Sequence, residues 1–415
     1  MLPAPLATYP GVLAWCTLAA LSGCAGGPAA PHSSGGPSGA TTSNGAADTG
    51  GGKAGGASQG GQGGSDAAVG GSLGGASAAG SASSSGGRDA GGGNAGTGSS
   101  ISIDGRELVV NGAPFRIRGV NWNPVAKGKT HPTGLDFAGF ADRDIALMKA
   151  AGINAVRTYE RLEDPAVLDK LQAAGIRVFS TVYGWWEDDP MVVVARVDAV
   201  KAHPAILAWV IGNEWNYNRL YSQGSKEPPL TLAETRGRLN SAAAAIKQAD
   251  PLHPVSTIYG EFEGLAESVA AMPDIDIWGI NAYRGISFGD LFERFEGVST
   301  KPLYLGEYGA DAYDSRGAGK VDLASQAEAT TKLTQELIDH YVGPGAGSVA
   351  LGGFVFEWAD EWWKAGSPDT QEVGGVAPGG GPYPDATFNE EYWGVVDIER
   401  NPRPAYDSLK ALYAQ

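Results

Sequence analysis

The sequence contains little cysteine and few histidines, and both shortages limit the chemistry open to it. Its two cysteines, Cys16 and Cys24, lie near the amino terminus. The rest of the chain therefore forms no disulfide and offers no thiol nucleophile. The five histidines do not cluster. Because histidine is the commonest metal ligand, we expect neither a metal ion nor another cofactor.

Positive charge is also scarce. The chain has 30 Lys and Arg against 46 Asp and Glu, which gives a net charge of −16. Residues 1–100 contribute −1, from three Asp against one Lys and one Arg, so residues 101–415 carry −15. Such an acidic chain repels phosphate groups, which argues against nucleic acid or an anionic membrane surface as a partner.

Long apolar runs are missing as well. The apolar stretch at residues 12–21 is too short to span a bilayer permanently, which favours a cleaved export signal. It ends in LSGC, which resembles the lipobox of bacterial lipoproteins, so residues 1–24 are predicted to be a lipoprotein-type signal with a lipid anchor on Cys24. No Lys or Arg precedes the stretch, and an ordinary secretory signal is the alternative. We expect a protein that is anchored at the cell envelope or secreted.

Residues 25–100 consist almost entirely of Gly, Ala and Ser and contain no aromatic residue. Such a segment buries too little apolar surface to offset the entropy of ordering it, so it is predicted to be a disordered tether. Residues 101–415 hold nearly all of the aromatic residues and are long enough for one large core. We expect them to form a single, monomeric domain.

Short apolar stretches alternate with amphipathic ones throughout this domain. After a hairpin signal at Asp104-Gly105, eight strand patterns follow, with helix patterns between them. The strands are expected at 115–122, 154–159, 177–183, 206–216, 254–260, 276–283, 302–309 and 352–360. This order matches a (β/α)8 TIM barrel. An open doubly wound sheet is the rival fold, but no Gly-rich phosphate loop follows the first strand.

In such a barrel, the carboxyl ends of the strands carry the functional side chains. The residues at these ends are rich in Trp, Tyr and carboxylates. Aromatic rings cover the C–H faces of sugars, while Glu, Asn and Arg bind hydroxyl groups, so we expect an oligo- or polysaccharide substrate. The candidate substrate-binding residues are Asn121, Arg157, Tyr159, Trp185, Trp186, Asn213, Tyr283 and Trp358. Packing inside the barrel is the alternative role for each Trp.

Two carboxylates stand out at these strand ends. Glu214 follows the fourth strand and Glu307 ends the seventh. Hydrolysis of a glycosidic bond requires one carboxylic acid that protonates the leaving oxygen and a second carboxylate that attacks or supports the anomeric carbon. Burial and the like charge of its partner would raise the pKa of the acid. Glu214 and Glu307 are therefore the candidate catalytic pair.

The motifs around them resemble a known clan. GNE at 212–214 and GEYG at 306–309 are similar to clan A of the glycoside hydrolases, which are retaining barrels with catalytic Glu on strands four and seven. NGAPFRIRGVNW, INAVRTY, HPAILAWVIGNEW and GINAYRG resemble, in this order, the barrel domain of glycoside hydrolase family 2. FVFEWADEWW and YWGVVDIE are also similar to the family 72 β-1,3-glucanosyltransferases. The resemblance covers nearly all of residues 111–413.

The resemblance implies a role for individual residues. It implies that Glu214 is the acid/base, that Glu307 is the nucleophile, and that Asn213 binds the sugar 2-hydroxyl. Tyr283 and Arg157 match residues that contact the nucleophile or lie near it. Trp358 matches the platform beneath the reacting sugar.

The function expected from these residues is retaining hydrolysis of a β-linked saccharide. A β-glucan transglycosylase would use the same residues, and a non-catalytic carbohydrate-binding barrel is a further alternative. The stretch EWADEWW at 357–363 is predicted to line the substrate site as a loop after the eighth strand. For Glu361 and Trp362, clamping of neighbouring loops is the alternative role.

Overall fold

The computed structural model describes residues 100–185, 188–220, 230–373 and 381–415. The predicted signal, the lipid anchor on Cys24 and the predicted tether lie outside these described residues, as does Trp186.

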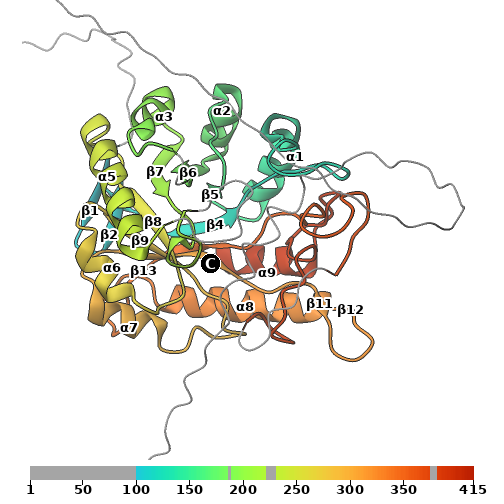
Figure 1. Cartoon of the computed structure of the whole chain (residues 1–415). Coiled ribbons are helices and arrows are strands. Elements are labelled where there is room, and N and C mark those ends of the chain that lie inside the picture. Colours follow the sequence, from blue (N-terminus) through green and yellow to red (C-terminus); the bar gives the residue numbers. More distant parts are fainter. Residues whose placement is uncertain (1–99, 186–187, 221–229, 374–380) are drawn as a thin grey trace, which may run out of the picture. The chain divides into compact units, whose positions relative to one another are not determined.

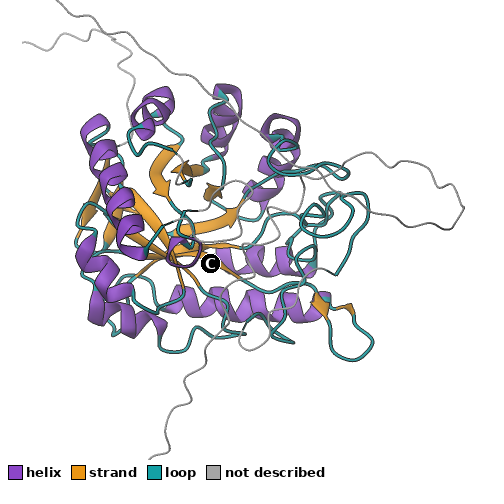
Figure 2. Cartoon of the chain, in the orientation of Figure 1, coloured by secondary structure: helices purple, strands orange, loops and turns teal. Residues whose placement is uncertain are grey.

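Eight parallel strands close into a barrel, as the sequence predicts (Figure 2). They follow one another around the barrel in chain order, and the last, β13, pairs with the first, β4. The strands are β4 (Ile117–Asn121), β5 (Ala155–Thr158), β6 (Arg177–Tyr183), β7 (Ile206–Ile211), β8 (Val255–Gly260), β9 (Ile277–Asn281), β10 (Leu303–Tyr308) and β13 (Ala350–Val355). Every residue of β7, β8, β9, β10 and β13 is buried. This explains why the sequence shows continuous apolar runs instead of alternation.

Helices lie around the outside of the barrel (Figure 1). Several of their starts follow from capping residues, such as Asp164 before α2 and the capping box formed by Thr231 and Glu234 at α5. The helices are α1 (Phe137–Ala150), α2 (Pro165–Ala174), α3 (Val192–Val200), α4 (Trp215–Asn218), α5 (Leu232–Ala249), α6 (Leu265–Ala271), α7 (Leu291–Val298), α8 (Leu323–Asp339) and α9 (Pro404–Tyr413). Of these, α4 and α6 are too short for the sequence pattern to predict.

A small antiparallel sheet precedes the barrel. β1 (Ile101–Asp104) and β2 (Glu107–Val110) form the predicted hairpin, and β3 (Ala113–Pro114) adds a third strand. Gly105 takes the positive φ of 59° that the tight turn requires. A second hairpin, of β11 (Tyr313–Asp314) and β12 (Lys320–Val321), follows β10.

Two layers of apolar side chains hold the barrel together. The inner layer fills the barrel itself, where the rings of Phe179, Tyr304 and Phe354 meet edge to face at 5.1–5.6 Å between centroids. The outer layer packs the strands against the helices. The interior is therefore a packed core, and a ligand would bind at the strand ends rather than inside the barrel.

The eighth strand ends earlier than the sequence predicts. It stops at Val355, whereas the pattern places its end near residue 360. The next residues bond both to the barrel and to the chain near its carboxyl end. The amides of Phe356 and Trp358 donate to the carbonyls of Tyr308 and Asn121. The amides of Val395 and Val396 donate to the carbonyls of Glu357 and Trp358. This changes the direction in which Trp358 points, as described below.

A buried ion pair ties α1 to the segment before α9. Asp144 accepts hydrogen bonds from Nε1 of Trp122 at 2.8 Å and from Nε of Arg400 at 3.2 Å, and all three side chains are at most 1% exposed. The variant Asp144→Ala is expected to lower the free energy of unfolding by about 3–5 kcal/mol, because it leaves a buried guanidinium without its counter-charge.

Asp142→Ala on the same helix is the matched control. Its pair with Lys170 at 2.6 Å lies at the surface, so the loss should stay within about 1 kcal/mol. Urea unfolding of both variants measures the difference. Equal losses would contradict the importance of the buried pair.

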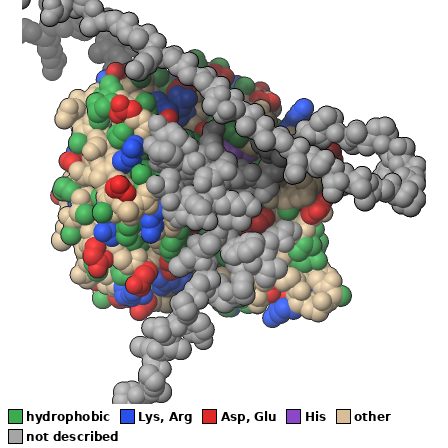
Figure 3. Space-filling model, in the orientation of Figure 1, with side chains coloured by type: hydrophobic (Ala, Val, Ile, Leu, Met, Phe, Trp, Pro, Cys, Tyr) green, Lys and Arg blue, Asp and Glu red, His purple; other side chains and the backbone are tan. Residues whose placement is uncertain are grey.

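Acidic, basic and hydrophobic side chains are interspersed on the face shown in Figure 3, where no single kind gathers into one patch. Within the described part of the chain, no helix has the length and apolarity needed to cross a membrane.

Candidate active site

The backbone turns sharply where β7 ends. Gly212 has a φ of 70° and Glu214 a φ of 47°, a region that non-Gly residues enter rarely and at a cost of about 1–3 kcal/mol. The amide of Glu214 donates to the carbonyl of Ile258 on β8 at 3.0 Å. This turn fixes Glu214 at the mouth of the barrel, where its side chain is 7% exposed.

Glu307, on β10, receives three hydrogen bonds at its carboxylate. Arg157 donates to Oε1 at 3.0 Å, Tyr159 donates to Oε1 at 2.8 Å, and Tyr283 donates to Oε2 at 2.9 Å. The Arg157 guanidinium is 1% exposed and lies over the Tyr159 ring at 4.6 Å. Both oxygens of Glu307 are thereby held in place, and a buried positive charge stabilises the carboxylate.

Asn213 and Asn281 connect the two carboxylates. Arg157 donates to Oδ1 of Asn213 at 2.7 Å. Nδ2 of Asn281 donates to the same oxygen at 3.3 Å and to Oε1 of Glu214 at 3.1 Å. One network of hydrogen bonds therefore runs from Glu307 to Glu214. The sequence places Asn281 at the end of a predicted strand without giving it a role, and the structure shows that it joins this network.

The pKa of Glu214 is raised to about 8. Burial is the largest cause, and the charge of Glu307 adds to it, while the hydrogen bond from Asn281 acts in the opposite direction. Glu214 is therefore mostly protonated at neutral pH and is able to donate a proton. A carboxyl group with a pKa near the working pH is suited to general acid/base chemistry.

The variant Glu307→Gln should lower the pKa of Glu214 from about 8, because a like charge nearby is removed. The pKa should stay above its ordinary value, since burial remains. Titration of the side-chain carboxyl carbon of Glu214 by NMR measures the change. Glu261→Gln is the control, because Glu261 is the smallest of the stated causes and should produce a smaller decrease. A Glu214 pKa that rises or does not move in Glu307→Gln would contradict this coupling.

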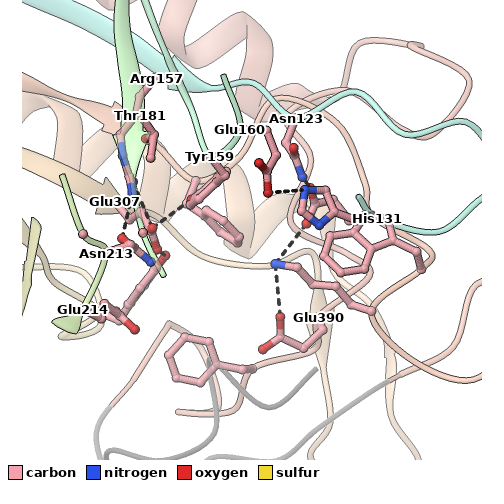
Figure 4. Close-up of a pocket in the computed structure, with 18 of the residues that line it drawn as sticks. Asn123, His131, Arg157, Tyr159, Glu160, Thr181, Asn213, Glu214, Glu307 and Glu390 are labelled. Carbon is pink, nitrogen blue, oxygen red and sulfur yellow. Dashed lines mark hydrogen bonds and ion pairs between the residues drawn. The ribbon is translucent and has the colours of Figure 1, made fainter. Parts of the chain in front are cut away.

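Both carboxylates line a cavity of about 180 Å³, together with Arg157, Tyr159 and Tyr283. Figure 4 shows Asn213, Glu214 and Glu307 on one side of this pocket and Asn123, His131 and Glu390 on the other. We call the latter side the opposite wall, defined as Asn123, His131, Glu160, Glu361, Trp363, Lys364 and Glu390.

Lys364 is the centre of the opposite wall. Its Nζ lies 3.1 Å from Oε2 of Glu361 and 3.5 Å from Oε2 of Glu390. Nδ2 of Asn123 donates to the other oxygen of Glu361 at 2.7 Å. The surrounding carboxylates raise the pKa of Lys364 in spite of its burial, so the ammonium group stays charged.

The His131 ring stacks on Trp363 with centroids 4.9 Å apart. Burial is the main cause that lowers the pKa of His131, so the imidazole is neutral at pH 7. His131 and Trp363 thus add an aromatic face to the opposite wall.

Most residues predicted for the site meet in the pocket. Of the eight predicted substrate-binding residues, five line the pocket: Arg157, Tyr159, Trp185, Asn213 and Tyr283. A sixth, Trp186, lies outside the described residues. The loop prediction is divided, because Glu361 lines the pocket whereas Trp362 does not. The Trp362 ring instead lies beneath Nζ of Lys127 at 4.4 Å.

The positions predicted for Asn121 and Trp358 are wrong. Asn121 lies one layer below the pocket, where Oδ1 accepts from Arg157 at 3.1 Å and Nδ2 donates to the carbonyl of Gly306 at 3.2 Å. It positions Arg157 and does not face the pocket. Trp358 is 1% exposed and packs on Tyr406 of α9 in the outer core. The early end of β13 turns it away, and Phe356 lines the pocket from this segment.

Most of the opposite wall and its aromatic neighbours were not predicted from the sequence, apart from Glu361 and Trp363 in the predicted loop. The pocket residues that were not predicted are Asn123, His131, Glu160, Thr181, Phe356, Lys364, Phe388 and Glu390. The sequence does contain many carboxylates and aromatic residues at 357–363 and 388–393. A loop, however, has no periodicity from which to predict which side chains point into a pocket. Among the described residues, no group of three or more His, Cys, Asp or Glu is arranged to hold a metal ion.

Comparison with known proteins agrees with this geometry. Residues 101–184 match the family model "Glycosyl hydrolases family 2, TIM barrel domain". The match covers the first part of the barrel domain, from β1 to the end of β6. The match begins at β1 and includes the strands that supply Arg157 and Tyr159. The resemblance to family 72 is not tested by these comparisons and stays a prediction.

The curated proteins similar to this chain include β-glycosidases. A β-glucuronidase of Sus scrofa is 25% identical over 240 residues, which cover 51% of this chain and 33% of the relative. A β-galactosidase of Staphylococcus xylosus is 22% identical over 305 residues, which cover 66% of this chain and 26% of the relative. The chain thus spans about a quarter to a third of the length of these relatives.

Solved structures share the barrel fold of this chain. A β-galacturonidase from Eisenbergiella tayi superposes with a TM-score of 0.54 at 20% identity, over 76% of this chain and 54% of the other. A β-glucuronidase of Bacteroides uniformis gives a TM-score of 0.56 at 20% identity, over 76% and 37%. At this identity the likeness shows the fold alone.

Proposed function

We propose that this protein is a retaining β-glycosidase that hydrolyses O-glycosidic bonds of a β-linked saccharide. One observation carries the proposal. A buried carboxyl group with a raised pKa, Glu214, lies in the same pocket as a second carboxylate, Glu307, which is held by Arg157 and two tyrosines. The family 2 match and the β-glycosidase relatives support it.

In the proposed reaction, Glu307 attacks the anomeric carbon while Glu214 protonates the departing oxygen. A covalent bond forms between the sugar and the Glu307 carboxylate, and the leaving sugar departs as a neutral alcohol. Glu214, now ionised, takes a proton from water, and the resulting attack releases Glu307. Each general acid or base step is worth about 10²–10⁴-fold in rate. Asn213, which precedes Glu214 and lines the same pocket, is proposed to bind a sugar hydroxyl.

Tyr283 is proposed to hold Glu307 in the orientation for attack. Tyr283→Phe removes its 2.9 Å hydrogen bond to Oε2 and should lower kcat/KM by about 10–100-fold, the range expected for a hydrogen bond to a charged group. Tyr313→Phe, outside the pocket lining, is the control and should keep its activity. Steady-state kinetics measure both variants. Equal behaviour of the two would argue against the role of Tyr283.

A panel of substrates tests the proposed function. Aryl β-glycosides and β-1,3-, β-1,4- and β-1,6-glucans, mannan and uronides are each incubated with the wild type and with Glu307→Gln. We expect sugar release by the wild type that Glu307→Gln does not reproduce. Longer products with an added oligosaccharide acceptor would reassign the protein as a transglycosylase. A rise in melting temperature with ligand, without release from any substrate, would identify a non-catalytic carbohydrate-binding barrel.

We further propose that the protein is exported and anchored by a lipid on Cys24, as LSGC indicates. Mass spectrometry of the mature amino terminus tests this. A lipid-modified Cys24 as the first residue is expected, and a Cys24→Ser variant that keeps the same membrane attachment would overturn the proposal.

A further inference from the structure

The charge of the pocket bears on which sugar enters it. Two cationic side chains line it among the described residues, Arg157 and Lys364. Five carboxyl groups face them: Glu160, Glu214, Glu307, Glu361 and Glu390. Even with Glu214 left out, four carboxyl groups face the two cations, and burial raises the pKa of two of the four, Glu160 and Glu390.

Both cations are already occupied. The terminal nitrogens of Arg157 are taken by Glu307 at 3.0 Å and Asn213 at 2.7 Å. Lys364 lies between Glu361 at 3.1 Å and Glu390 at 3.5 Å. Neutralising Glu390 would still leave Lys364 paired with Glu361. A carboxylate on the substrate would therefore have to displace a carboxylate of the protein to reach either cation.

The opposite wall offers acceptors to a ligand. Glu361 and Glu390 present carboxylate oxygens, and Oδ1 of Asn123 is buried without a hydrogen-bond partner among the described residues. These oxygens accept the hydrogens of sugar hydroxyl groups. An ionised carboxylate has no hydrogen to donate, and it would meet them as a like charge.

Resting on the proposed function, we propose that this pocket selects uncharged sugars and rejects uronides. The discrimination comes from Glu361 and Glu390, which hold Lys364 and leave an excess of negative charge in the pocket. The similar solved structures include enzymes named for uronic acids, but at about 20% identity they show the fold and not the sugar.

Matched substrate pairs test this proposal. 4-Nitrophenyl β-glucoside is compared with the β-glucuronide, and the β-galactoside with the β-galacturonide, so that each pair differs only at the sixth carbon. We expect kcat/KM for the better uncharged substrate to exceed that of its acidic counterpart by at least about 100-fold. A uronide that is cleaved as well as its uncharged counterpart would overturn the proposal while leaving the proposed function intact.

Variants assign the selection to the opposite wall. Glu390→Gln should shift the ratio of the two kcat/KM values toward the uronide by about 10-fold, because Lys364 loses one partner and the pocket one charge. Glu328→Gln, on the exposed side of α8, is the charge-matched control and should leave the ratio unchanged. Lys364→Met tests the alternative that Lys364 itself binds the carboxylate of a uronide. If it abolished uronide cleavage and spared the uncharged substrate, Lys364 would be a uronate ligand and the proposal would be wrong.

Measurements of ligand binding distinguish a failure of this inference from a failure of the proposed function. Absence of release from every glycoside in the panel would contradict the function. The preference is then measured by melting temperature with galactose, glucose, galacturonate and glucuronate. A larger rise with an uncharged sugar supports the inference, and a larger rise with a uronate overturns it.

Discussion

Replacing Glu307 by Gln is expected to lower kcat/KM on an aryl β-glycoside by about 10⁴-fold or more. Gln preserves the shape of the side chain and retains an acceptor for Tyr159 or Tyr283, but a neutral amide is a poor nucleophile. It also leaves the buried Arg157 guanidinium without its counter-charge. The melting temperature of the variant must therefore be measured alongside its kinetics, so that a loss of folding is not counted as a loss of catalysis.

Glu328→Gln provides the control for this variant. It removes the same charge from an exposed ion pair with Lys332 on α8 and should retain activity within about 2-fold. Chemical rescue adds a second test. In Glu307→Gly, azide should enter the vacated space and attack the anomeric carbon from the same side, giving the α-glycosyl azide. A β-glycosyl azide from this variant would assign Glu307 a different role.

Replacing Glu214 by Ala is expected to reduce the rate by an amount that depends on the leaving group. On a glycoside with a sugar as the leaving group, kcat/KM should fall by about 10²–10⁴-fold, since no acid protonates the departing oxygen. On a 2,4-dinitrophenyl glycoside the first step should be nearly normal, because that group departs without a proton. The second step still lacks its base, so a burst of dinitrophenolate is expected. Equal losses on both substrates would contradict the acid/base role.

The pH dependence of the wild type follows from the same group. A general acid works only while protonated, and the pKa of Glu214 is raised to about 8. Cleavage of substrates that need acid assistance should therefore fall as the pH rises through about 8, and this alkaline limb should be absent in Glu214→Ala. With azide, the Ala variant should form the β-glycosyl azide, the opposite anomer to that from Glu307→Gly.

The sequence predicts the barrel and the catalytic side of its pocket for one physical reason. Parallel strands buried on both faces read as apolar runs, and the polar residue that ends each run lies at a common rim. Arg157, Asn213, Glu214 and Glu307 were all identified in this way. Tyr283 lies two residues beyond the end of β9 and was identified for the same reason.

The errors begin where regular structure ends. Trp358 was assigned to the pocket because β13 was expected to continue to about residue 360. Beyond Val355 the carbonyls of Glu357 and Trp358 instead accept hydrogen bonds from Val395 and Val396, more than 30 residues further along the chain, and the Trp358 side chain packs in the outer core. The contacts of Lys364 with Glu361 and Glu390 likewise depend on how two loops close on each other. The local periodicity of a sequence does not predict how two loops pack against each other.

Trapping the glycosyl-enzyme intermediate tests the central claim most directly. The protein is incubated with a 2-deoxy-2-fluoro β-glycoside of the sugar it cleaves best, in which fluorine slows the breakdown of the intermediate, and its peptides are mapped by mass spectrometry. The mass of one fluoroglycosyl group is predicted on the peptide that contains Glu307, and the carboxyl oxygen of Glu307 is the attachment point. A label on Glu214 or Glu390, or turnover with inversion at the anomeric carbon and no label, would contradict it.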